Sequence, residues 1–200
     1  MDLNQQLFDF LFQFTHKSGL LDGLFVFFAK YLTYLLVTAI LIWLFGKAGR
    51  KLIFIFSELA ISAILSRGLI AEWIRFFYYN PRPFEALGFT SLVSESSASF
   101  PSGHMTFLFA LGTVIFFYNK KFGGWFLGLS FIVGIARIFA GVHWPYDIAG
   151  GIVIGALCGF IVHKILYPYW VKLELGPNVV KVGEIEVDAD GTMTEIPNPQ

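Results

Sequence analysis

Residues 20–45 read LLDGLFVFFAKYLTYLLVTAILIWLF, and this stretch decides the fold. The hydrocarbon core of a bilayer is about 30 Å thick, so a helix needs about 20 mainly apolar residues to cross it. The quoted stretch exceeds that length. We therefore expect residues 20–45 to form a transmembrane helix.

Four further apolar stretches follow along the chain: residues 52–79, 103–118, 125–142 and 147–167. The helical pattern of the second span would be about 42 Å long at 1.5 Å per residue, so its end should emerge from the membrane. The span at 103–118 is the shortest. The sequence thus predicts an all-α fold, a polytopic membrane helix bundle with about five transmembrane spans.

The N-terminal segment has a different pattern, because apolar residues recur at helical spacing among polar ones. These positions are Leu3, Leu7, Phe10, Leu11 and Phe14. No basic region precedes them, which argues against a cleaved signal peptide. The pattern predicts an amphipathic helix, too short to span, that lies at the interface or packs on the bundle.

The composition agrees with a membrane protein. Hydrophobic residues make up 56% of the chain and charged residues only 14%, against roughly 25% charged in soluble domains. The formal net charge is zero, so nothing favours nucleic acid as a partner. Cys158 is the only cysteine and lies in an apolar run, which predicts a small buried residue and excludes an intramolecular disulfide.

Basic residues predict the orientation of the spans. They gather in three places that share one side of the membrane if five helices alternate: Lys47, Arg50 and Lys51; Lys120 and Lys121; Lys164 and Lys172. The tendency of basic residues to remain inside makes that side cytoplasmic. The connection at 80–101 and the loop around His143 then face the outside.

We expect residues 1–167 to form the membrane-embedded domain and residues 168–200 a cytoplasmic C-terminal tail. Polar and apolar residues alternate in the tail, and residues 188–191 resemble a turn. A small hairpin and a disordered tail are both compatible with this pattern.

Polar residues form three patches at span ends that the topology places on one face. The first holds Arg75 and Arg82, followed by Pro83. Seven positions are two helical turns, so both arginines could project from one side of the emerging helix, although Pro81 must end regular helix nearby. Arginine forks match phosphate oxygens, but arginines at this depth also serve as head-group anchors.

The second patch is Pro101, Ser102, Gly103 and His104, immediately before the third span. Ser102 is suited to cap the helix, and Gly103 would let the backbone approach a ligand closely. The free amides and the helix dipole at such an end favour an anion. His104 would face whatever the amides hold.

The third patch is Arg137, His143 and Asp147. Pro145 suits the first turn of a new helix, which leaves His143 on the loop before it and puts Asp147 in its first turn. A carboxylate four residues away can bond one ring nitrogen and leave the other free as a nucleophile. A structural His–Asp pair is the alternative reading of this patch alone.

Together the patches resemble the signature of the type 2 phosphatidic acid phosphatase (PAP2) superfamily. That signature is Lys-x6-Arg-Pro, then Pro-Ser-Gly-His, then Ser-Arg-x5-His-x3-Asp. Here the three parts begin at Arg75, Pro101 and Ala136. The short chain and its Arg-Pro-Phe sequence are most similar to bacterial undecaprenyl-diphosphate phosphatases. Arg75 replaces the usual Lys and Ala136 the usual Ser, which bears on substrate preference and rate.

The resemblance implies a role for each matched residue. His143 would attack phosphorus and become a phosphohistidine, Asp147 would orient it, and His104 would protonate the leaving group and later activate water. The phosphate-binding residues would be Arg75, Arg82, Ser102, Gly103 and Arg137. With three arginines supplying charge, no metal or other cofactor is expected.

The leading interpretation is an integral membrane lipid phosphatase that converts undecaprenyl diphosphate to undecaprenyl phosphate and phosphate. Phosphatidic acid, phosphatidylglycerophosphate and lipid A phosphate are alternative substrates that the sequence does not separate. A lipid transporter with a vestigial site is a third possibility, although no inverted repeat supports it. We expect the protein in the bacterial cytoplasmic membrane, with its site on the extracytoplasmic face, where cell-wall transfer reactions leave the carrier lipid diphosphate.

Several other residues are given no catalytic role. His16 and His163 are interpreted as interfacial side chains, and Glu58 as a protonated or hydrogen-bonded carboxyl inside the second span. Three glycines recur every fourth residue on the last span and predict a close-packing face, inside the bundle or between two copies: Gly151, Gly155 and Gly159.

Overall fold

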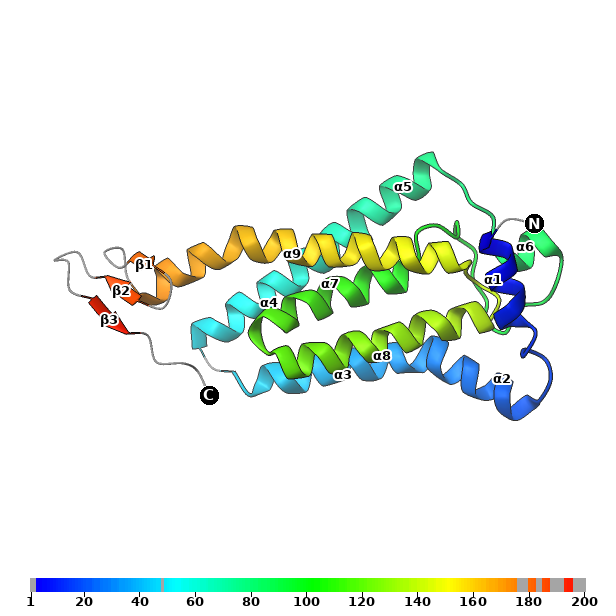
Figure 1. The fold of residues 1–200 in the computed structure, drawn as a ribbon, viewed down its shortest axis with the longest axis horizontal. Helices are drawn as coiled ribbons and strands as arrows, with labels where there is room; N and C mark the ends of the chain where they lie inside the picture. Colours follow the sequence, from blue (N-terminus) through cyan, green and yellow to red (C-terminus); the bar gives the residue numbers. More distant parts are fainter. Residues whose placement is uncertain (1–2, 48, 176–179, 183–184, 188–192, 196–200) are drawn as a thin grey trace. The chain divides into compact units, whose positions relative to one another are not determined.

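The structure is a computed structural model of the chain, and it describes residues 3–47, 49–175, 180–182, 185–187 and 193–195. The chain divides into two compact units, Met1–His163 and Lys164–Gln200. The helices are α1 (Leu3–Phe12), α2 (Gly19–Val26), η1 (Phe27–Tyr31), α3 (Leu32–Phe45), α4 (Gly49–Ala63), η2 (Ile64–Ile70), α5 (Ala71–Phe77), α6 (Pro83–Leu87), α7 (Gly103–Tyr118), α8 (Lys120–Phe139) and α9 (Pro145–Leu175) (Figure 1).

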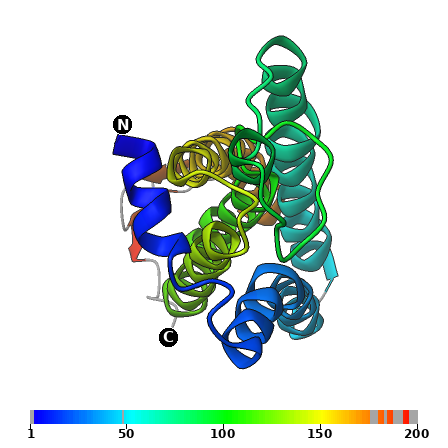
Figure 2. The ribbon, with the colours of Figure 1, turned by 90° about the vertical axis from the view of Figure 1, so that its right-hand side faces the viewer.

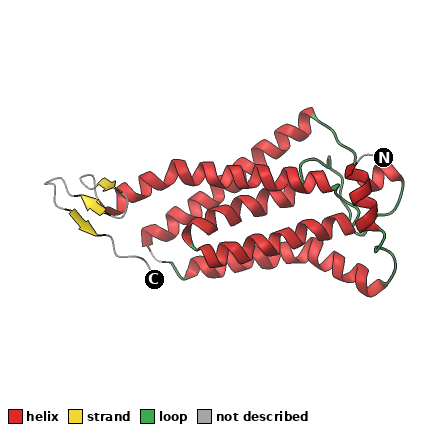
Figure 3. Ribbon diagram, viewed as in Figure 1, coloured by secondary structure: helices red, strands yellow, loops and turns green. Residues whose placement is uncertain are grey.

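Among the described residues, four helices are long and apolar enough to cross a membrane: Gly19–Phe45, Gly49–Phe77, Lys120–Phe139 and Pro145–Lys172. The first two are continuous helices that each include a π-helical segment, η1 and η2. The apolar helix α7 is the fifth, and α1 precedes them all (Figure 3). The predicted helical membrane bundle is therefore confirmed.

The exterior of the long helices is apolar, as a bilayer requires. Phe45 is 86% exposed, Phe76 83% and Trp125 69%. Exposed apolar side chains on this scale are unfavourable in water but favourable against lipid tails. The protein is accordingly a multi-pass membrane protein.

The helix α7 lies at the centre of the bundle, which explains how it can be so short. Its 16 residues span about 24 Å, less than the bilayer core. Met105, Leu108, Val114 and Ile115 on it are fully buried. Because most of α7 packs against protein, the helix does not need the full length of a lipid-facing span.

The three glycines of α9 pack against α7. A Cβ atom at Gly151 would lie 2.7 Å from the Ser102 carbonyl oxygen, and one at Gly155 would lie 2.5 Å from that of Thr106. Gly159 meets the Ala110 carbonyl oxygen in the same way. The close-packing face therefore lies inside the bundle. Cys158 is buried beside it, as predicted.

The helix α8 begins five residues before the predicted start at 125. Asn119 caps it, because its side-chain Oδ1 accepts a hydrogen bond of 2.9 Å from the backbone N–H of Phe122. Lys120 and Lys121 thus belong to the first turn of α8, not to a connection. Gly123 then sits against the backbone of Phe116, where no larger residue fits.

The N-terminal helix α1 packs on the bundle, which is one of the two predicted arrangements. It lies across the end of the bundle where α9 begins (Figures 1 and 2). Phe8 is fully buried, with its ring centroid 5.1 Å from that of Trp144. The side chain of Asn4 accepts a hydrogen bond of 3.0 Å from the backbone N–H of Tyr146.

One buried polar cluster lies inside the bundle, away from the three patches. Tyr118 donates a hydrogen bond to Glu58, and Nδ1 of His163 lies 3.1 Å from the other carboxyl oxygen of Glu58. The hydrogen-bonded reading of Glu58 is confirmed. The interfacial reading of His163 is wrong, because this histidine is only 7% exposed and stacks on Phe117.

The second unit contains the end of α9 and a small antiparallel sheet. Its strands are β1 (Val180–Val182), β2 (Ile185–Val187) and β3 (Met193–Glu195), in the order β1-β2-β3. Val187 pairs with Met193, so β2 and β3 form an antiparallel pair on either side of the predicted turn. The predicted turn at residues 188–191 lies outside the described residues.

Candidate active site

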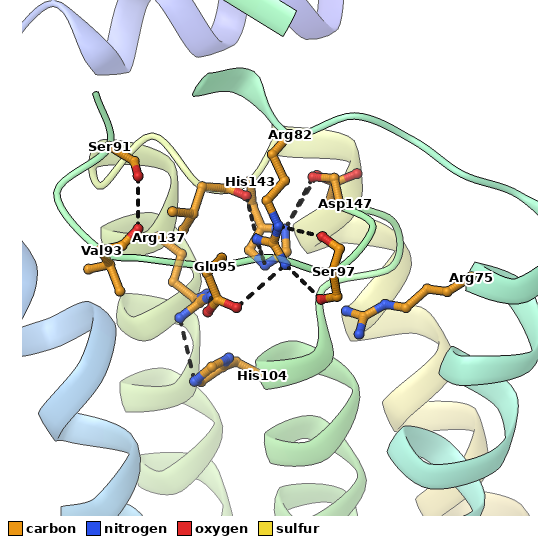
Figure 4. Close-up of polar contacts among 12 residues, drawn as sticks. Arg75, Arg82, Ser91, Val93, Glu95, Ser97, His104, Arg137, His143 and Asp147 are labelled. Atoms are coloured by element: carbon orange, nitrogen blue, oxygen red, sulfur yellow. Dashed lines mark hydrogen bonds and ion pairs between the residues drawn. The ribbon is translucent and has the colours of Figure 1, made fainter. Parts of the chain in front are cut away.

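The three polar patches meet in one cavity of about 200 Å³. Its lining comes from the first two spans, the segment at 82–97, α7, α8 and the loop before α9. The lining residues are Thr33, Arg67, Arg75, Arg82, Glu95, Ser97, Gly103, His104, Phe107, Arg137 and His143. Six of the eight predicted site residues are therefore together, and Ser102 and Asp147 are not part of the lining. Figure 4 shows Asp147 beside His143.

His143 is held on the loop between α8 and α9. The loop turns at Gly141, whose φ of 76° is favourable only for glycine. Nδ1 of His143 lies 3.4 Å from Oδ2 of Asp147, and Nε2 lies 3.5 Å from Nη1 of Arg82. Nε2 is thus the ring nitrogen on the arginine side. The predicted position of His143 before the helix and of Asp147 in its first turn agrees with the structure.

The Asp147 carboxylate is anchored by several donors besides His143. The backbone N–H of Trp144 donates to Oδ2 at 2.8 Å, and the Ser99 hydroxyl donates to the same oxygen. The side-chain amide of Asn80 donates to Oδ1 at 3.3 Å. Ser99 and Asn80 were not predicted from the sequence, because neither belongs to a recognised motif.

Arg82 reaches the cavity from a different element than predicted. The helix bearing Arg75 ends at Phe77, and Arg82 is the N-cap of α6, after an extended segment. Pro81 and Pro83 prevent a continuous helix here. Arg82 is 1% exposed and donates to the carbonyl oxygens of Ser97 at 2.7 Å and Val142 at 2.8 Å. These contacts, not helical spacing, direct its guanidinium toward His143.

Arg137 projects from the last turn of α8 and is 2% exposed. Its Nη1 donates to the Ala29 carbonyl oxygen at 3.3 Å and lies 3.4 Å from Nε2 of His104. Its Nε has no hydrogen-bonding partner within the described part of the chain. Buried donors normally find partners, so this one is available to an anion.

Arg75 donates from Nη2 to the Pro101 carbonyl oxygen at 2.8 Å and from Nη1 to Glu72 at 3.1 Å. A fourth arginine, Arg67, pairs with the same Glu72 and also lines the cavity. Arg67 was not predicted as a site residue, because it belongs to no motif. A charged residue inside a membrane span was the signal that could have identified it.

The Ser-Gly pair before α7 plays a different part than expected. Ser102 is the N-cap residue but makes no capping hydrogen bond through its side chain, and its hydroxyl has no partner among the described residues. A Cβ atom at Gly103 would collide with the guanidinium of Arg67. Gly103 therefore makes room for an arginine rather than for a ligand.

Glu95 is a second site residue that was not predicted from the sequence, because it belongs to no motif. Its carboxylate forms an ion pair with Arg137, and Oε2 lies 3.6 Å from Nη2 of Arg82. Burial alone would raise the pKa of Glu95, but the guanidiniums of Arg137 and Arg82 lower it below its usual value. The Glu95 carboxylate thus occupies the position in which a bound phosphate would contact Arg82 and Arg137.

The charge around His143 favours its neutral form. Burial, followed by repulsion from Arg137 and Arg82, lowers the pKa of His143 well below its usual value. A neutral imidazole can act as a nucleophile, whereas a protonated one cannot. The site therefore combines a neutral imidazole with several cationic donors, which is an arrangement suited to a phosphate ester.

Comparison with known proteins agrees with this chemistry. The sequence profile of the PAP2 superfamily matches residues 51–170. Undecaprenyl-diphosphatase BcrC of Bacillus subtilis (strain 168) is 31% identical over 163 residues, which cover 80% of this chain and 82% of that protein. Bacitracin transport permease protein BcrC of Bacillus licheniformis is 31% identical over 164 residues, which cover 80% and 79%.

The fold has a counterpart among solved structures. The crystal structure of Aquifex aeolicus LpxE matches with a TM-score of 0.67 and 30% identity, over 82% of this chain and 96% of that one. The fold and site define a multi-pass membrane phosphatase, a hydrolase. The chain belongs to the PAP2 superfamily.

Proposed function

We propose that the protein hydrolyses undecaprenyl diphosphate to undecaprenyl phosphate and inorganic phosphate through a phosphohistidine. The observation that carries this proposal is the orientation of His143, whose Nε2 faces the arginine-lined cavity while Nδ1 faces Asp147. The similarity to the undecaprenyl-diphosphatase of Bacillus subtilis supports the choice of lipid.

In the first step, Nε2 of His143 attacks the terminal phosphorus, so that an N–P bond forms as the bond to the bridging oxygen breaks. His104 gives a proton to that oxygen, which leaves as part of undecaprenyl phosphate. In the second step, His104 takes a proton from water, whose oxygen attacks phosphorus. The N–P bond then breaks, and inorganic phosphate is released.

The arginines supply the charge that phosphoryl transfer requires. Arg75, Arg82 and Arg137 hold the oxygens of the transferred group, and Arg67 adds a fourth positive charge beside Gly103. Positioning and charge neutralisation are the main contributions to catalysis of this reaction. Phosphate displaces the Glu95 carboxylate from Arg82 and Arg137 as it binds.

Phosphate release from the purified protein in detergent tests this function. The panel comprises undecaprenyl diphosphate, phosphatidic acid, phosphatidylglycerophosphate and lipid A phosphate, and the His143→Ala protein is the blank. We expect the highest kcat/KM for undecaprenyl diphosphate. Faster turnover of another lipid would overturn the choice of substrate, and no turnover of any of them would overturn the function.

We place the reaction on the extracytoplasmic face of the bacterial cytoplasmic membrane, with residues 168–200 inside. Two basic groups support this orientation, since Lys47 precedes α4 and Lys120 begins α8. Both helices begin at the opposite end of the bundle from the starts of α7 and α9, which flank the site (Figure 1).

Cysteine labelling in a Cys158→Ser background tests the orientation. Ser96→Cys should react with an impermeant maleimide in intact cells, while Lys121→Cys should not. Both positions are exposed, and a substitution at Lys121 does not remove the Asn119 side chain that caps α8. The reverse pattern would move the site to the cytoplasm.

A further inference from the structure

A second cavity, of about 330 Å³, adjoins the catalytic one. It is lined by part of the first span and part of the loop that carries Glu95. Glu95, His104 and Arg137 line both cavities. The residue proposed to protonate the leaving group therefore stands on the boundary between the two spaces.

The first span contributes polar groups to both cavities. Lys30 lines the second cavity, and Thr33 lines the catalytic one. These two residues are three positions apart on one continuous helix, and each lines one of the two adjoining cavities. The hydroxyl of Thr33 is buried and has no hydrogen-bonding partner in the part of the chain that the structure describes.

The π-helical segment η1 fixes this part of the first span against α8. Its Ala29 carbonyl oxygen accepts a hydrogen bond from Nη1 of Arg137, the arginine common to both cavities. Such segments are frequent at functional sites because they alter the helical register locally. The PAP2 profile match begins at residue 51, so this part of the first span lies before the segment that the profile covers.

We infer that Lys30 and Thr33 form a subsite for the second phosphate of a lipid diphosphate, the phosphate that stays on the lipid. This inference rests on the proposed function for the terminal phosphate. With the terminal phosphate among the arginines, the bridging oxygen lies at His104 and the second phosphate enters the adjoining cavity. Lys30 pairs with that phosphate, and the Thr33 hydroxyl donates to it.

The subsite has a consequence for specificity. A lipid monophosphate fills only the catalytic cavity and gains nothing from Lys30. A diphosphate gains one further charge-assisted contact, of the kind that is stronger than a neutral hydrogen bond. Lys30 is thus a specificity-determining residue, which favours diphosphates over monophosphates.

Binding of two inorganic probes tests the subsite without requiring turnover. Affinities for inorganic pyrophosphate and inorganic phosphate are measured by calorimetry in a His143→Ala background. We expect Lys30→Gln to weaken pyrophosphate binding by about tenfold and to change phosphate binding by less than about twofold. Thr33→Val should weaken pyrophosphate binding by about threefold.

Matched variants on the same part of the chain serve as controls. Lys17→Gln removes an exposed positive charge just before the same span, and Thr38→Val removes an exposed hydroxyl one turn beyond Thr33. Neither should alter either affinity. Equal losses for both anions in Lys30→Gln, or no loss for either, would overturn the inference.

The two proposals fail in different ways. If the wild-type protein releases no phosphate from a lipid diphosphate, the proposed function is wrong. The pyrophosphate measurement still decides the subsite in that case, because it depends on binding alone. If turnover is present but Lys30→Gln keeps the wild-type ratio of diphosphate to monophosphate kcat/KM, the subsite is wrong and the function stands.

Discussion

Oδ2 of Asp147 lies 3.4 Å from Nδ1 of His143 and also accepts hydrogen bonds from the Ser99 hydroxyl and the Trp144 backbone N–H. The carboxylate is therefore held by donors that do not take part in the reaction. In the proposed mechanism, a carboxylate held in this way keeps the imidazole oriented both before and after phosphorus becomes attached to Nε2.

His143→Ala should lower kcat by at least about 10⁴-fold, because the variant lacks the imidazole that is proposed to form the covalent bond to phosphorus. Asp147→Asn should be less severe, about 10²-fold, because an amide can still contact the ring but does not stabilise its positive charge. Steady-state phosphate release measures both. A His143→Ala protein with lipid-phosphatase activity close to wild type would refute the assigned nucleophile.

The lowered pKa of His143 gives a pH prediction. Because burial and the nearby arginines lower the pKa of His143 well below 6.5, the imidazole of the free protein should stay neutral at pH values where histidine ordinarily becomes protonated. NMR of ¹⁵N-histidine protein, with His143→Ala for assignment, follows the ring directly. A titration midpoint between about 6 and 7 for His143 would contradict the expectation.

The same lowered pKa affects stability. In the unfolded chain, His143 binds a proton below about pH 6.5, whereas the folded form does not. The free energy of unfolding should therefore decrease as the pH falls below that value. Glu95, whose folded pKa is also lowered, adds a second decrease as the pH falls below the usual value of 4.5.

Glu95→Gln should strengthen inhibition by vanadate, which resembles the phosphoryl transition state. The carboxylate competes for Arg82 and Arg137, and the amide competes less well, so we expect the inhibition constant to fall about threefold to tenfold. Glu85→Gln is the matched control, because Glu85 contacts Tyr79 and the Arg82 backbone outside the cavity. Weaker inhibition in Glu95→Gln would indicate that this carboxylate supports anion binding.

Gly103→Ala should raise KM by about tenfold, because the added methyl group displaces the guanidinium of Arg67. Arg67→Ala should have a similar effect on its own. If the glycine acts through the arginine, the double variant should be no worse than either single one. Additive losses would show that Gly103 contributes in another way.

Activity should persist in EDTA, since arginines supply the positive charge in the proposed mechanism. Phosphate release is measured before and after chelation, with Mg²⁺ added back. Loss in EDTA followed by recovery with Mg²⁺ would contradict the mechanism.

The membrane spans were predictable because their signal is long and local. Apolar length alone predicted residues 20–45 and 103–118 within one residue of the observed helices. The start of α8 was missed because it depends on a single capping side chain, Asn119. Gly123 and Gly124, which follow the cap, ordinarily argue against a helix. Cap chemistry outweighed the glycine signal there.

The motif residues were also predictable, but the side chains that organise them were not. Spacing indicated which residues belong together, and the structure brings six of the eight to one cavity. Glu95 and Arg67 belong to no motif, and their positions depend on contacts between distant segments. The prediction that Arg82 projects from the same helix as Arg75 was wrong for the same reason. Hydrogen bonds to the carbonyl oxygens of Ser97 and Val142, not helical spacing, direct its side chain.

The packing of α1 on the loop of His143 has a practical consequence for experiments. Phe8 contacts Trp144, and Asn4 accepts a hydrogen bond from the backbone N–H of Tyr146, so α1 supports the segment that carries the proposed nucleophile. An affinity tag fused at the N-terminus, or a trimmed start, would disturb that segment directly. Expression vectors for kinetic work should therefore carry the tag after Gln200.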